Sequence, residues 1–537
     1  MAFRFCAPRL TSWIPLGLLL CSNVAFSTEW IVKFRQARYQ KAVPAFQHMM
    51  GVSLLGRHDT GHLALVDIDN TSSKQATQIL QEIQSRIDVE YMVPNIKLHA
   101  FEDIAGDPQR SKQWSLLKVH AEEAWRIQRG GRKTVVAVID TGVDYTHEDL
   151  KDRIWTNEKE VADNGIDDDQ NGFVDDRRGW DFFGKTNNPM DLTSDKNPGH
   201  GTHCSGIIGA QGDNNVGISG IAPNISIMPI RFLGADGSGD LYTAALAIDY
   251  ATNNGADVIS ASWGAAVARD QVKPILEAIE RAGQKGIIFV AAAANDGEAN
   301  DTREVYPANA GFKNVISVAA SNNEDQKPSW SNYGTATVDL ASPGADIFST
   351  LPGNKYGNLS GTSMATPLVA GMVALLKSQA NDQRDTLQAE DYKAILQATG
   401  EDVNIETACK CRVNIFHAVE HVVNHTLTVV PNAATLATKA TMTFKAIGGK
   451  APYRFTSSHE EIASINPTTG ALEAKQDGEC TLTVTDAEGT HVNSRAIHVG
   501  QKTQPPGGGK CPIEDPELCA LMCVIQPELP WCHSLDR

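Results

Sequence analysis

The chain has 537 residues, which is too long for one compact core and predicts two to four domains. Hydrophobic residues make up 42% and charged residues 21%, proportions that favour a folded soluble protein over a disordered one. The formal net charge of −17 argues against a nucleic-acid partner, because phosphate binding needs a basic surface. It suits a protein that stays soluble outside the cell and holds cations.

Residues 1–27 have the pattern of an export signal. Two arginines supply the positive end, residues 13–21 form a short apolar run, and small residues fit a cleavage after Ser27. The run is too short for a transmembrane anchor, and a lipoprotein signal at Cys21 is disfavoured because Leu20 is bulky where a small residue is expected. No later segment is long and apolar enough to cross a membrane. We therefore expect a secreted protein, with the periplasm or the cell surface as alternatives.

The segment from residue 28 to 104 has a small α/β pattern, with strands at 30–34 and 63–68 and a helix near 76–87. From residue 105 to 422, short buried strands alternate with helices. The clearest strands are at 134–139, 225–232, 258–262, 287–293 and 315–319, and the clearest helices are at 241–253 and 271–285. This order predicts an α/β fold with a mostly parallel sheet and helices on both faces.

After residue 425 the pattern changes to short alternating strands separated by Gly, Pro and Asn turns. It predicts a small β-sandwich at 426–500, with strands at 441–446, 453–455, 480–485 and 494–499. Residues 501–510 are a Pro- and Gly-rich linker, and 511–537 form a tail with four cysteines. Outside the cell, four clustered cysteines favour two disulfides with three possible pairings. A zinc site is the alternative, although the spacing is looser than that of paired CxxC motifs.

Three short segments carry residues suited to nucleophilic catalysis. Asp140 ends a buried strand before a Thr-Gly turn, at the sheet edge where α/β proteins place their sites. Glycines flank His200 and let its imidazole project, and a metal site shared with His203 would need a third ligand that is not evident. Ser363 precedes an apolar helical stretch, whose N-terminus would stabilise negative charge. Taken singly, each segment also fits a turn, a packing or an N-cap role.

Taken together, Asp-Thr-Gly, His-Gly-Thr-His and Gly-Thr-Ser-Met-Ala in this order resemble the subtilisin-like serine proteases, over roughly residues 28–422. The resemblance implies that Ser363 attacks the peptide carbonyl, that His200 transfers the proton and that Asp140 orients the imidazole. It also implies that Asn295 and the backbone N–H of Ser363 stabilise the oxyanion. We therefore expect a secreted serine endopeptidase acting on proteins or peptides.

The resemblance extends to the substrate cleft, with two departures. Ala294 stands where the family commonly has Gly, so one methyl group is added beside the primary specificity pocket. Trp263 replaces a Leu in one wall of that pocket, and Val305 would lie near its floor. The expected substrate-binding positions are Gly237, Ser238, Gly239, Ser262, Trp263, Gly264 and Val305. Since no charged residue is among them, we expect apolar or medium-sized side chains before the scissile bond.

An acidic segment predicts a calcium site. Oxygen-bearing side chains alternate around a Gly, as in the first part of an EF-hand loop, but Arg178 stands where the closing Glu should be. The expected ligands are Asp167, Asp169, Asn171, Asp175 and Asp176. A second site of the family would use Asp149 with the loop 212–218. Calcium at either site would serve stability rather than chemistry, and a solvated acidic loop is the alternative for the first.

Residues 28–104 resemble the family's inhibitory propeptide, most clearly at 89–95. We expect self-cleavage between Asn95 and Asp107, because the residues that follow resemble the start of mature enzymes. The 426–500 region resembles bacterial immunoglobulin-like repeats, whose role could be adhesion, substrate presentation or spacing. We expect a monomer.

Three internal cysteines lie in the α/β region, and two other functions are alternatives to the protease interpretation. Cys204 is expected to be a buried thiol, while Cys409 and Cys411 are too close for an easy bridge within one strand, so their pairing stays open. One rival is a catalytically idle binding protein, which is disfavoured because every triad position and Asn295 are present. The other is a secreted esterase, but Ser363 lies in Gly-Thr-Ser-Met-Ala rather than Gly-x-Ser-x-Gly.

Overall fold

The structure is a computed structural model, and it describes residues 29–35, 39, 43–44, 52–68, 79, 83, 86–95, 97–100 and 113–500. The predicted signal peptide, most of the helix expected near 76–87, the linker 501–510 and the cysteine-rich tail 511–537 lie outside the described residues. Among the described residues, no helix combines the length and the hydropathy that a membrane span requires.

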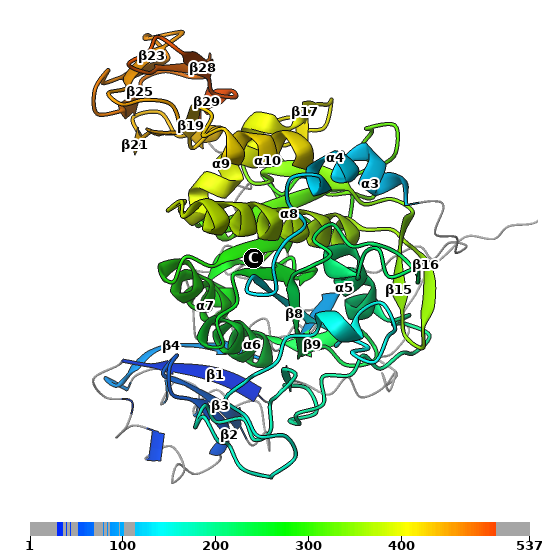
Figure 1. Ribbon diagram of the computed structural model, residues 1–537. Coiled ribbons are helices and arrows are strands. Elements are labelled where there is room, and N and C mark those ends of the chain that lie inside the picture. Colours follow the sequence, from blue (N-terminus) through cyan, green and yellow to red (C-terminus); the bar gives the residue numbers. More distant parts are fainter. Residues whose placement is uncertain are drawn as a thin grey trace, which may run out of the picture.

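A nine-stranded sheet forms the middle of the larger region (Figure 1). Its order is β17-β18-β14-β13-β12-β10-β6-β8-β7, and every neighbouring pair is parallel except β17 and β18. The strands are β6 (Val135–Asp140), β7 (Trp180–Asp181), β8 (Ser226–Arg231), β10 (Val258–Ala261), β12 (Ile288–Ala292), β13 (Val315–Ser321), β14 (Leu340–Pro343), β17 (Glu401–Asp402) and β18 (Cys411–Arg412). The mostly parallel sheet predicted from the sequence is confirmed.

Helices cover both faces of this sheet because its strands are apolar on both sides. On β6, Val136 and Val138 join one hydrophobic core, while Ala137 and Ile139 join the other. One face carries α5 (His200–Gly209), α8 (Thr362–Gln383), α9 (Ala389–Thr399) and α10 (Ile415–Val423), together with the short α3 (Trp114–Lys118) and α4 (Ala121–Trp125). The other face carries α6 (Leu241–Asn253) and α7 (Lys273–Gln284). Outside the sheet, β15 (Ile347–Leu351) and β16 (Lys355–Leu359) form a hairpin.

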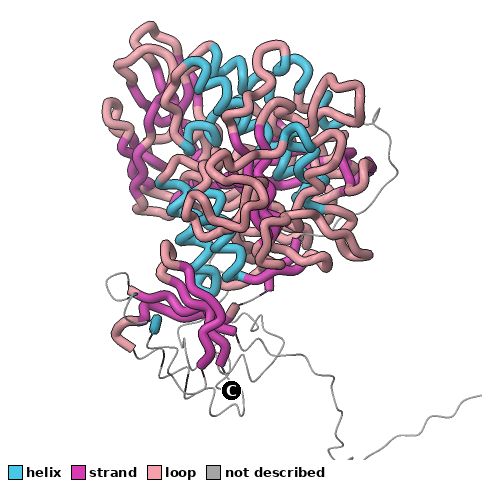
Figure 2. Tube along the Cα trace, turned by 60° about the horizontal axis from the view of Figure 1, so that its bottom comes forward, coloured by secondary structure: helices cyan, strands magenta, loops and turns pink. Residues whose placement is uncertain are grey.

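The N-terminal region is a separate four-stranded antiparallel sheet in the order β2-β3-β1-β4. Its strands are β1 (Glu29–Phe34), β2 (Val52–His58), β3 (Leu63–Ile68) and β4 (Val89–Pro94). Ile31, Leu63 and Val93 belong to the same hydrophobic core as Tyr242 of α6. Figures 1 and 2 both show this sheet at one end of the molecule, on the side of the larger region that α6 and α7 cover.

A further strand leaves the N-terminal sheet and enters the larger region. β5 (Lys97–Ala100) lies between β9 (Ser238–Asp240) and β11 (Trp263–Gly264) and is antiparallel to both. Leu98 is opposite Gly239, and Ala100 is opposite Trp263. The N-terminal region therefore ends in a strand on the two segments that the sequence predicts to bind substrate.

The C-terminal region consists of small sheets around a core of its own, which includes Phe444, Phe455 and Leu482. The strands are β19 (Thr428–Val430), β20 (Ala434–Leu436), β21 (Thr441–Thr443), β22 (Lys445–Ile447), β23 (Arg454–Ser457), β24 (Ala463–Ile465), β25 (Ala471–Ala474), β26 (Gly478–Cys480), β27 (Leu482–Thr485), β28 (His491–Asn493) and β29 (Ile497–Val499). This region contacts α9 through Lys445, whose Nζ lies 2.8 Å from Asp391. The predicted strand-rich C-terminal region is confirmed.

The structure contains a disulfide between two cysteines whose pairing the sequence leaves open. Cys409 and Cys411 are joined by a disulfide, with their Cα atoms 5.1 Å apart. The expected difficulty applied to two cysteines in one strand, but only Cys411 lies in β18. Lys410 between them has a φ of 50°, which turns the backbone and brings the two side chains to the same side.

Candidate active site

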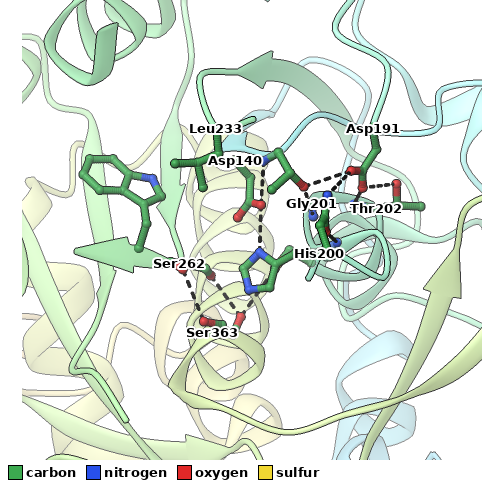
Figure 3. Close-up of polar contacts among 12 residues, drawn as sticks. Asp140, Asp191, His200, Gly201, Thr202, Leu233, Ser262 and Ser363 are labelled. Atoms are coloured by element: carbon green, nitrogen blue, oxygen red, sulfur yellow. Dashed lines mark hydrogen bonds and ion pairs between the residues drawn. The ribbon is translucent and has the colours of Figure 1, made fainter. Parts of the chain in front are cut away.

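Asp140, His200 and Ser363 come from three distant segments and lie at one edge of the sheet (Figure 3). Asp140 is the last residue of β6, His200 is the first residue of α5, and Ser363 is the second residue of α8. The Nδ1 atom of His200 lies 2.7 Å from Oδ1 of Asp140, and both side chains are buried. A buried carboxylate at this distance fixes the tautomer of the imidazole and stabilises its protonated form.

Two glycines allow α5 to approach the turn after β6 this closely. A Cβ atom on Gly201 would lie 2.1 Å from the carbonyl oxygen of Gly142 and 3.1 Å from Cβ of Asp140. Gly142 itself has a φ of 107°, a conformation that favours glycine. The Thr-Gly and His-Gly dipeptides of the sequence motifs therefore serve backbone contact between the two segments.

The two neighbouring histidines have different surroundings. His203 is fully buried, its Nε2 lies 3.1 Å from the carbonyl oxygen of Gly357, and burial lowers its pKa to about 3. It stays neutral at physiological pH and does not contact Asp140. Cys204 is a buried thiol, as predicted, and its Sγ lies 3.5 Å from the carbonyl oxygen of Ser363.

Ser363 is held by a reciprocal pair of hydrogen bonds with Ser262. The Ser363 hydroxyl donates to the carbonyl oxygen of Ser262 at 3.2 Å, and the Ser262 hydroxyl donates to the carbonyl oxygen of Ser363 at 2.9 Å. Because Ser363 lies in the first turn of the 22-residue helix α8, the helix dipole and the first N–H groups favour negative charge beside it. This geometry provides a nucleophile next to an anion-stabilising helix end.

Asn295 supplies a further donor near this helix end. Its Oδ1 accepts hydrogen bonds from the backbone N–H of Thr362 at 2.9 Å and from the Thr362 hydroxyl at 3.0 Å. The Nδ2 atom is buried and has no hydrogen-bond partner among the residues that the structure describes. A buried donor without a partner costs about 1–3 kcal/mol, which is recovered when a ligand oxygen accepts from it.

Ala294, just before Asn295, has strained backbone geometry. Its φ is 93°, a region that residues with a Cβ rarely occupy, and its side chain is fully buried. The backbone N–H of Ala294 donates to the Thr362 hydroxyl at 3.2 Å, and its carbonyl oxygen accepts from the N–H of Asn332 at 2.9 Å. Thr362 thus contacts both residues and holds the strained segment against the start of α8.

The expected substrate-binding positions divide into backbone and side-chain roles. Ser238, Gly239, Trp263 and Gly264 pair with β5 through their backbones. The indole of Trp263, in contrast, is fully buried, donates to the carbonyl oxygen of Ile139 at 2.8 Å and packs on Phe232 with ring centroids 4.8 Å apart.

Two other expected positions shape the segments nearby. Gly237 has a φ of 76° at the turn before β9, and the Ser238 hydroxyl donates to Asp236 at 2.7 Å. Val305 is buried, and its N–H donates to Oδ1 of Asn309 at 3.1 Å.

The acidic loop brings two of the predicted residues together with a third carboxylate, that of Glu160. Carboxylate oxygens of Glu160, Asp167 and Asp169 lie within 4.8 Å of one another. Glu160 is 2% exposed, and its Oε2 has no hydrogen-bond partner in the described part of the chain. Three carboxylates with a buried, unpaired oxygen fit a hard cation such as Ca²⁺. The sequence pattern missed Glu160 because it lies seven positions before Asp167, outside the alternating segment.

The other predicted loop ligands, Asn171, Asp175 and Asp176, take part in hydrogen bonds within the protein. Asp175 accepts the backbone N–H groups of Asn164 and Gly165 at 3.0 and 2.9 Å. Asp176 is fully buried and accepts the Tyr250 hydroxyl at 2.6 Å, while burial raises its pKa. The Asn171 amide donates to Asp176 at 3.0 Å, and its Oδ1 accepts the N–H of Phe173 at 2.8 Å. These three side chains hold the loop in shape.

Asp149, the residue expected at a second calcium site, contacts the 212–218 loop. Asp149 is fully buried and accepts hydrogen bonds from the Asn214 amide at 2.8 Å and from the N–H of Ile218 at 2.7 Å. The Tyr356 hydroxyl donates to the same carboxylate at 3.0 Å. Gly217 is required here, since a Cβ atom would lie 1.8 Å from Oδ2 of Asp149. The structure thus brings Asp149 together with the 212–218 loop.

A comparison with known protein families decides the class. Residues 131–413 match the model of the Subtilase family, Peptidase S8. The chain belongs to the subtilase family. A second match, to the bacterial Ig-like domain (group 2), covers residues 425–496.

Individual relatives agree with the family match. The chain is 36% identical over 344 residues to the thermophilic serine proteinase of Bacillus sp. (strain AK1), covering 63% of this chain and 77% of the relative. It is 37% identical over 314 residues to thermitase of Thermoactinomyces vulgaris, covering 58% of this chain and 97% of thermitase. The subtilase is therefore a subtilisin-like serine endopeptidase.

Proposed function

We propose that this subtilase is secreted, removes its own N-terminal region, and cleaves peptide bonds with Asp140, His200 and Ser363 as its catalytic triad. The observation that carries the proposal is the 2.7 Å contact of buried Asp140 with His200, at the edge of the sheet where Ser363 lies in the first turn of α8. The family membership supports the same assignment, since serine endopeptidase chemistry needs a nucleophile and a base.

The reaction then follows from these groups. The Ser363 hydroxyl attacks the carbonyl carbon of the scissile bond while His200 accepts its proton, and Asp140 stabilises the imidazolium. The oxyanion accepts hydrogen bonds from Nδ2 of Asn295 and the backbone N–H of Ser363, a donor pair of which one member is worth about 2.7–4 kcal/mol. His200 next gives the proton to the leaving amine. Water, activated by His200, finally hydrolyses the acyl-enzyme.

The N-terminal region is proposed to act as inhibitor and first substrate. β5 runs antiparallel between β9 and β11, which is how an extended peptide would bind. Ala100 is opposite Trp263, and the next residue back along the chain, Ser262, has its carbonyl oxygen 3.2 Å from the Ser363 hydroxyl. A cleavage shortly after Ala100, within the predicted interval from Asn95 to Asp107, is therefore expected.

Calcium is proposed as a stabilising ion. Glu160, Asp167 and Asp169 would hold it in the acidic loop, and Asp149 with the 212–218 loop would hold a second ion. A cation there would offset the repulsion between neighbouring carboxylates, and it supplies no step of the reaction.

Secretion is proposed from the signal pattern at 1–27. The substrates are proposed to be proteins or peptides with an uncharged, apolar or medium-sized residue before the scissile bond. A peptide library that shows a strong preference for Lys, Arg or Glu at that position would contradict this specificity.

The test compares the wild type with Ser363→Ala for casein hydrolysis and for release of the N-terminal region. We expect the wild type to yield a mature chain that begins after residue 100, whereas Ser363→Ala stays full-length and inactive. Equal cleavage by both proteins would refute the proposed mechanism. Wild-type protein that hydrolyses casein but still begins at Thr28 would refute the processing step alone.

A further inference from the structure

A second buried carboxylate, Asp191, lies beside the Asp140–His200 pair (Figure 3). Asp191 is 4% exposed and accepts four hydrogen bonds from three residues. Oδ1 accepts the Thr141 hydroxyl at 3.0 Å and the Asn197 amide at 3.1 Å, and Oδ2 accepts the Thr202 N–H at 3.0 Å and the Thr202 hydroxyl at 2.7 Å. Four donors on one buried carboxylate exceed what a simple turn needs.

The donors of Asp191 connect to the backbone on both sides of the catalytic pair. Thr141 directly follows Asp140, and its hydroxyl oxygen accepts the N–H of Gly201 at 3.0 Å. Oδ1 of Asn197 accepts the N–H of Gly199 at 3.0 Å and the N–H of His200 at 2.8 Å. The first N–H groups of α5 are thereby satisfied by the same network that holds the turn after β6.

Thr202 completes the connection. Its hydroxyl oxygen accepts the N–H of Asp144, in the turn after β6, at 2.9 Å, while its proton goes to Asp191. Asp191 therefore contacts one residue next to Asp140, one residue two positions after His200, and one residue that binds the His200 backbone. Burial raises the pKa of Asp191, while the hydrogen bonds from Thr202 and Asn197 favour its charged form.

We propose that Asp191 is a positioning residue that sets the distance and orientation between Asp140 and His200. This proposal rests on the proposed catalytic roles of Asp140 and His200, and it assigns Asp191 no contact with substrate. Loss of the network would let α5 shift relative to β6, and a displacement of about 1 Å in a catalytic group can cost roughly 100-fold in rate. Substrate binding on β9 and β11 would be untouched.

Asp191→Asn keeps the side-chain shape but places an amide where two donors already point, so it weakens the network. We expect kcat to fall by roughly 100-fold while KM changes by less than about threefold. Asp391→Asn is the matched control, because Asp391 is 3% exposed and accepts the N–H of Gln388 at 2.8 Å at the start of α9, away from the pair. It should leave kcat and KM within about twofold of the wild type.

A second readout reports on the pair directly and does not depend on processing. In a Ser363→Ala background every variant stays full-length, and the low-field ¹H NMR resonance of the proton between His200 and Asp140 can be followed. We expect Asp191→Asn to shift this resonance or broaden it by faster exchange, and Asp391→Asn to leave it unchanged.

Unchanged kcat and an unchanged low-field resonance in folded Asp191→Asn would overturn the proposal, even if Ser363→Ala confirmed the mechanism. So would an equal loss of kcat in Asp391→Asn, which would indicate general damage. If Asp191→Asn does not fold, Thr141→Val removes one donor at similar volume. We expect it to lower kcat about tenfold and to shift the resonance, and the absence of both effects would equally overturn the proposal.

Discussion

Two regions of the molecule hold their functional side chains in different ways: the sheet edge at Asp140, and the acidic loop at 160–176. At the sheet edge, regular elements bring Asp140, His200 and Ser363 together, and close backbone packing leaves little freedom. In the loop, irregular backbone is held by Asp175 and Asp176, whose carboxylates accept hydrogen bonds from the N–H of Gly165 and from the hydroxyl of Tyr250 on α6. A motif therefore predicts the positions of side chains well where strands and helices fix the backbone. It predicts them less well in an irregular loop, where a carboxylate can either accept a hydrogen bond from the loop or bind a cation.

The largest expected effect lies at the sheet edge. Asp140→Asn keeps the shape of the side chain but no longer favours the correct imidazole tautomer, so kcat should fall by roughly 10⁴-fold. Steady-state hydrolysis of a chromogenic peptide measures this. A loss below about tenfold would mean that the 2.7 Å contact is not part of the catalytic machinery.

Asn295→Leu tests the oxyanion donor at the same edge. We expect kcat to fall by roughly 10²–10³-fold with little change in KM, because the Nδ2 hydrogen bond forms only as negative charge develops. A variant that raises KM and leaves kcat unchanged would show that Asn295 binds the ground state instead.

The acidic loop gives the next largest effect. Glu160→Gln should remove much of the rise in thermal midpoint that calcium produces, an effect of about 2.7 kcal/mol when the ion is at 100 times its Kd. Asp175→Asn is the control: it should lower stability equally with calcium and with chelator, because Asp175 holds the loop through Asn164 and Gly165. Scanning calorimetry in both conditions measures the difference. Identical calcium dependence in Glu160→Gln and wild type would exclude Glu160 as a ligand.

Docking of the N-terminal sheet should weaken in acid. Nε2 of His58 lies 3.1 Å from Asp249, yet burial lowers the pKa of His58 below 6.5. The nearby charges of Asp249 and Asp59 favour protonation of His58. Arg281, which donates a hydrogen bond to Asp249, and Lys33 oppose it. Since the docked pKa is lower than the free one, the docking energy is fully present above pH 6.5 and declines as pH falls through the docked pKa.

Inhibition of mature wild type by the separately added N-terminal region measures this, and we expect the inhibition constant to rise several-fold between pH 7.5 and pH 5.5. His58→Gln should flatten the pH dependence. A constant that does not change with pH in the wild type would rule out His58 as the responsive group.

The smallest effect is expected at Ala294. Ala294→Gly removes a Cβ from a residue with a φ of 93°, so it should stabilise the folded protein by about 1 kcal/mol. The specificity pocket of this variant should also accept larger side chains at the residue before the scissile bond. A destabilised variant with unchanged specificity would show that the methyl group is a packing element rather than part of the pocket wall.

The fold was predictable because its strands are apolar runs and its helices have clear bounds; the expected helix at 241–253 is α6 residue for residue. The residues at the sheet edge were predictable because the motifs fall at strand and helix ends. Glu160 and Asp191 were not, since neither lies within a motif and only the folded chain brings each of them to its neighbours. The disulfide of Cys409 and Cys411 depends on the positive φ of Lys410, which no sequence pattern predicts.

Covalent labelling tests the central claim most directly. Mature enzyme treated with a sulfonyl or phosphonyl fluoride should gain one adduct, which peptide mapping by mass spectrometry assigns to the hydroxyl of Ser363, with activity lost in proportion to labelling. His200→Ala should label far more slowly, since the base that activates the hydroxyl is gone. An adduct on another residue, or full activity in protein whose Ser363 is completely modified, would contradict the account.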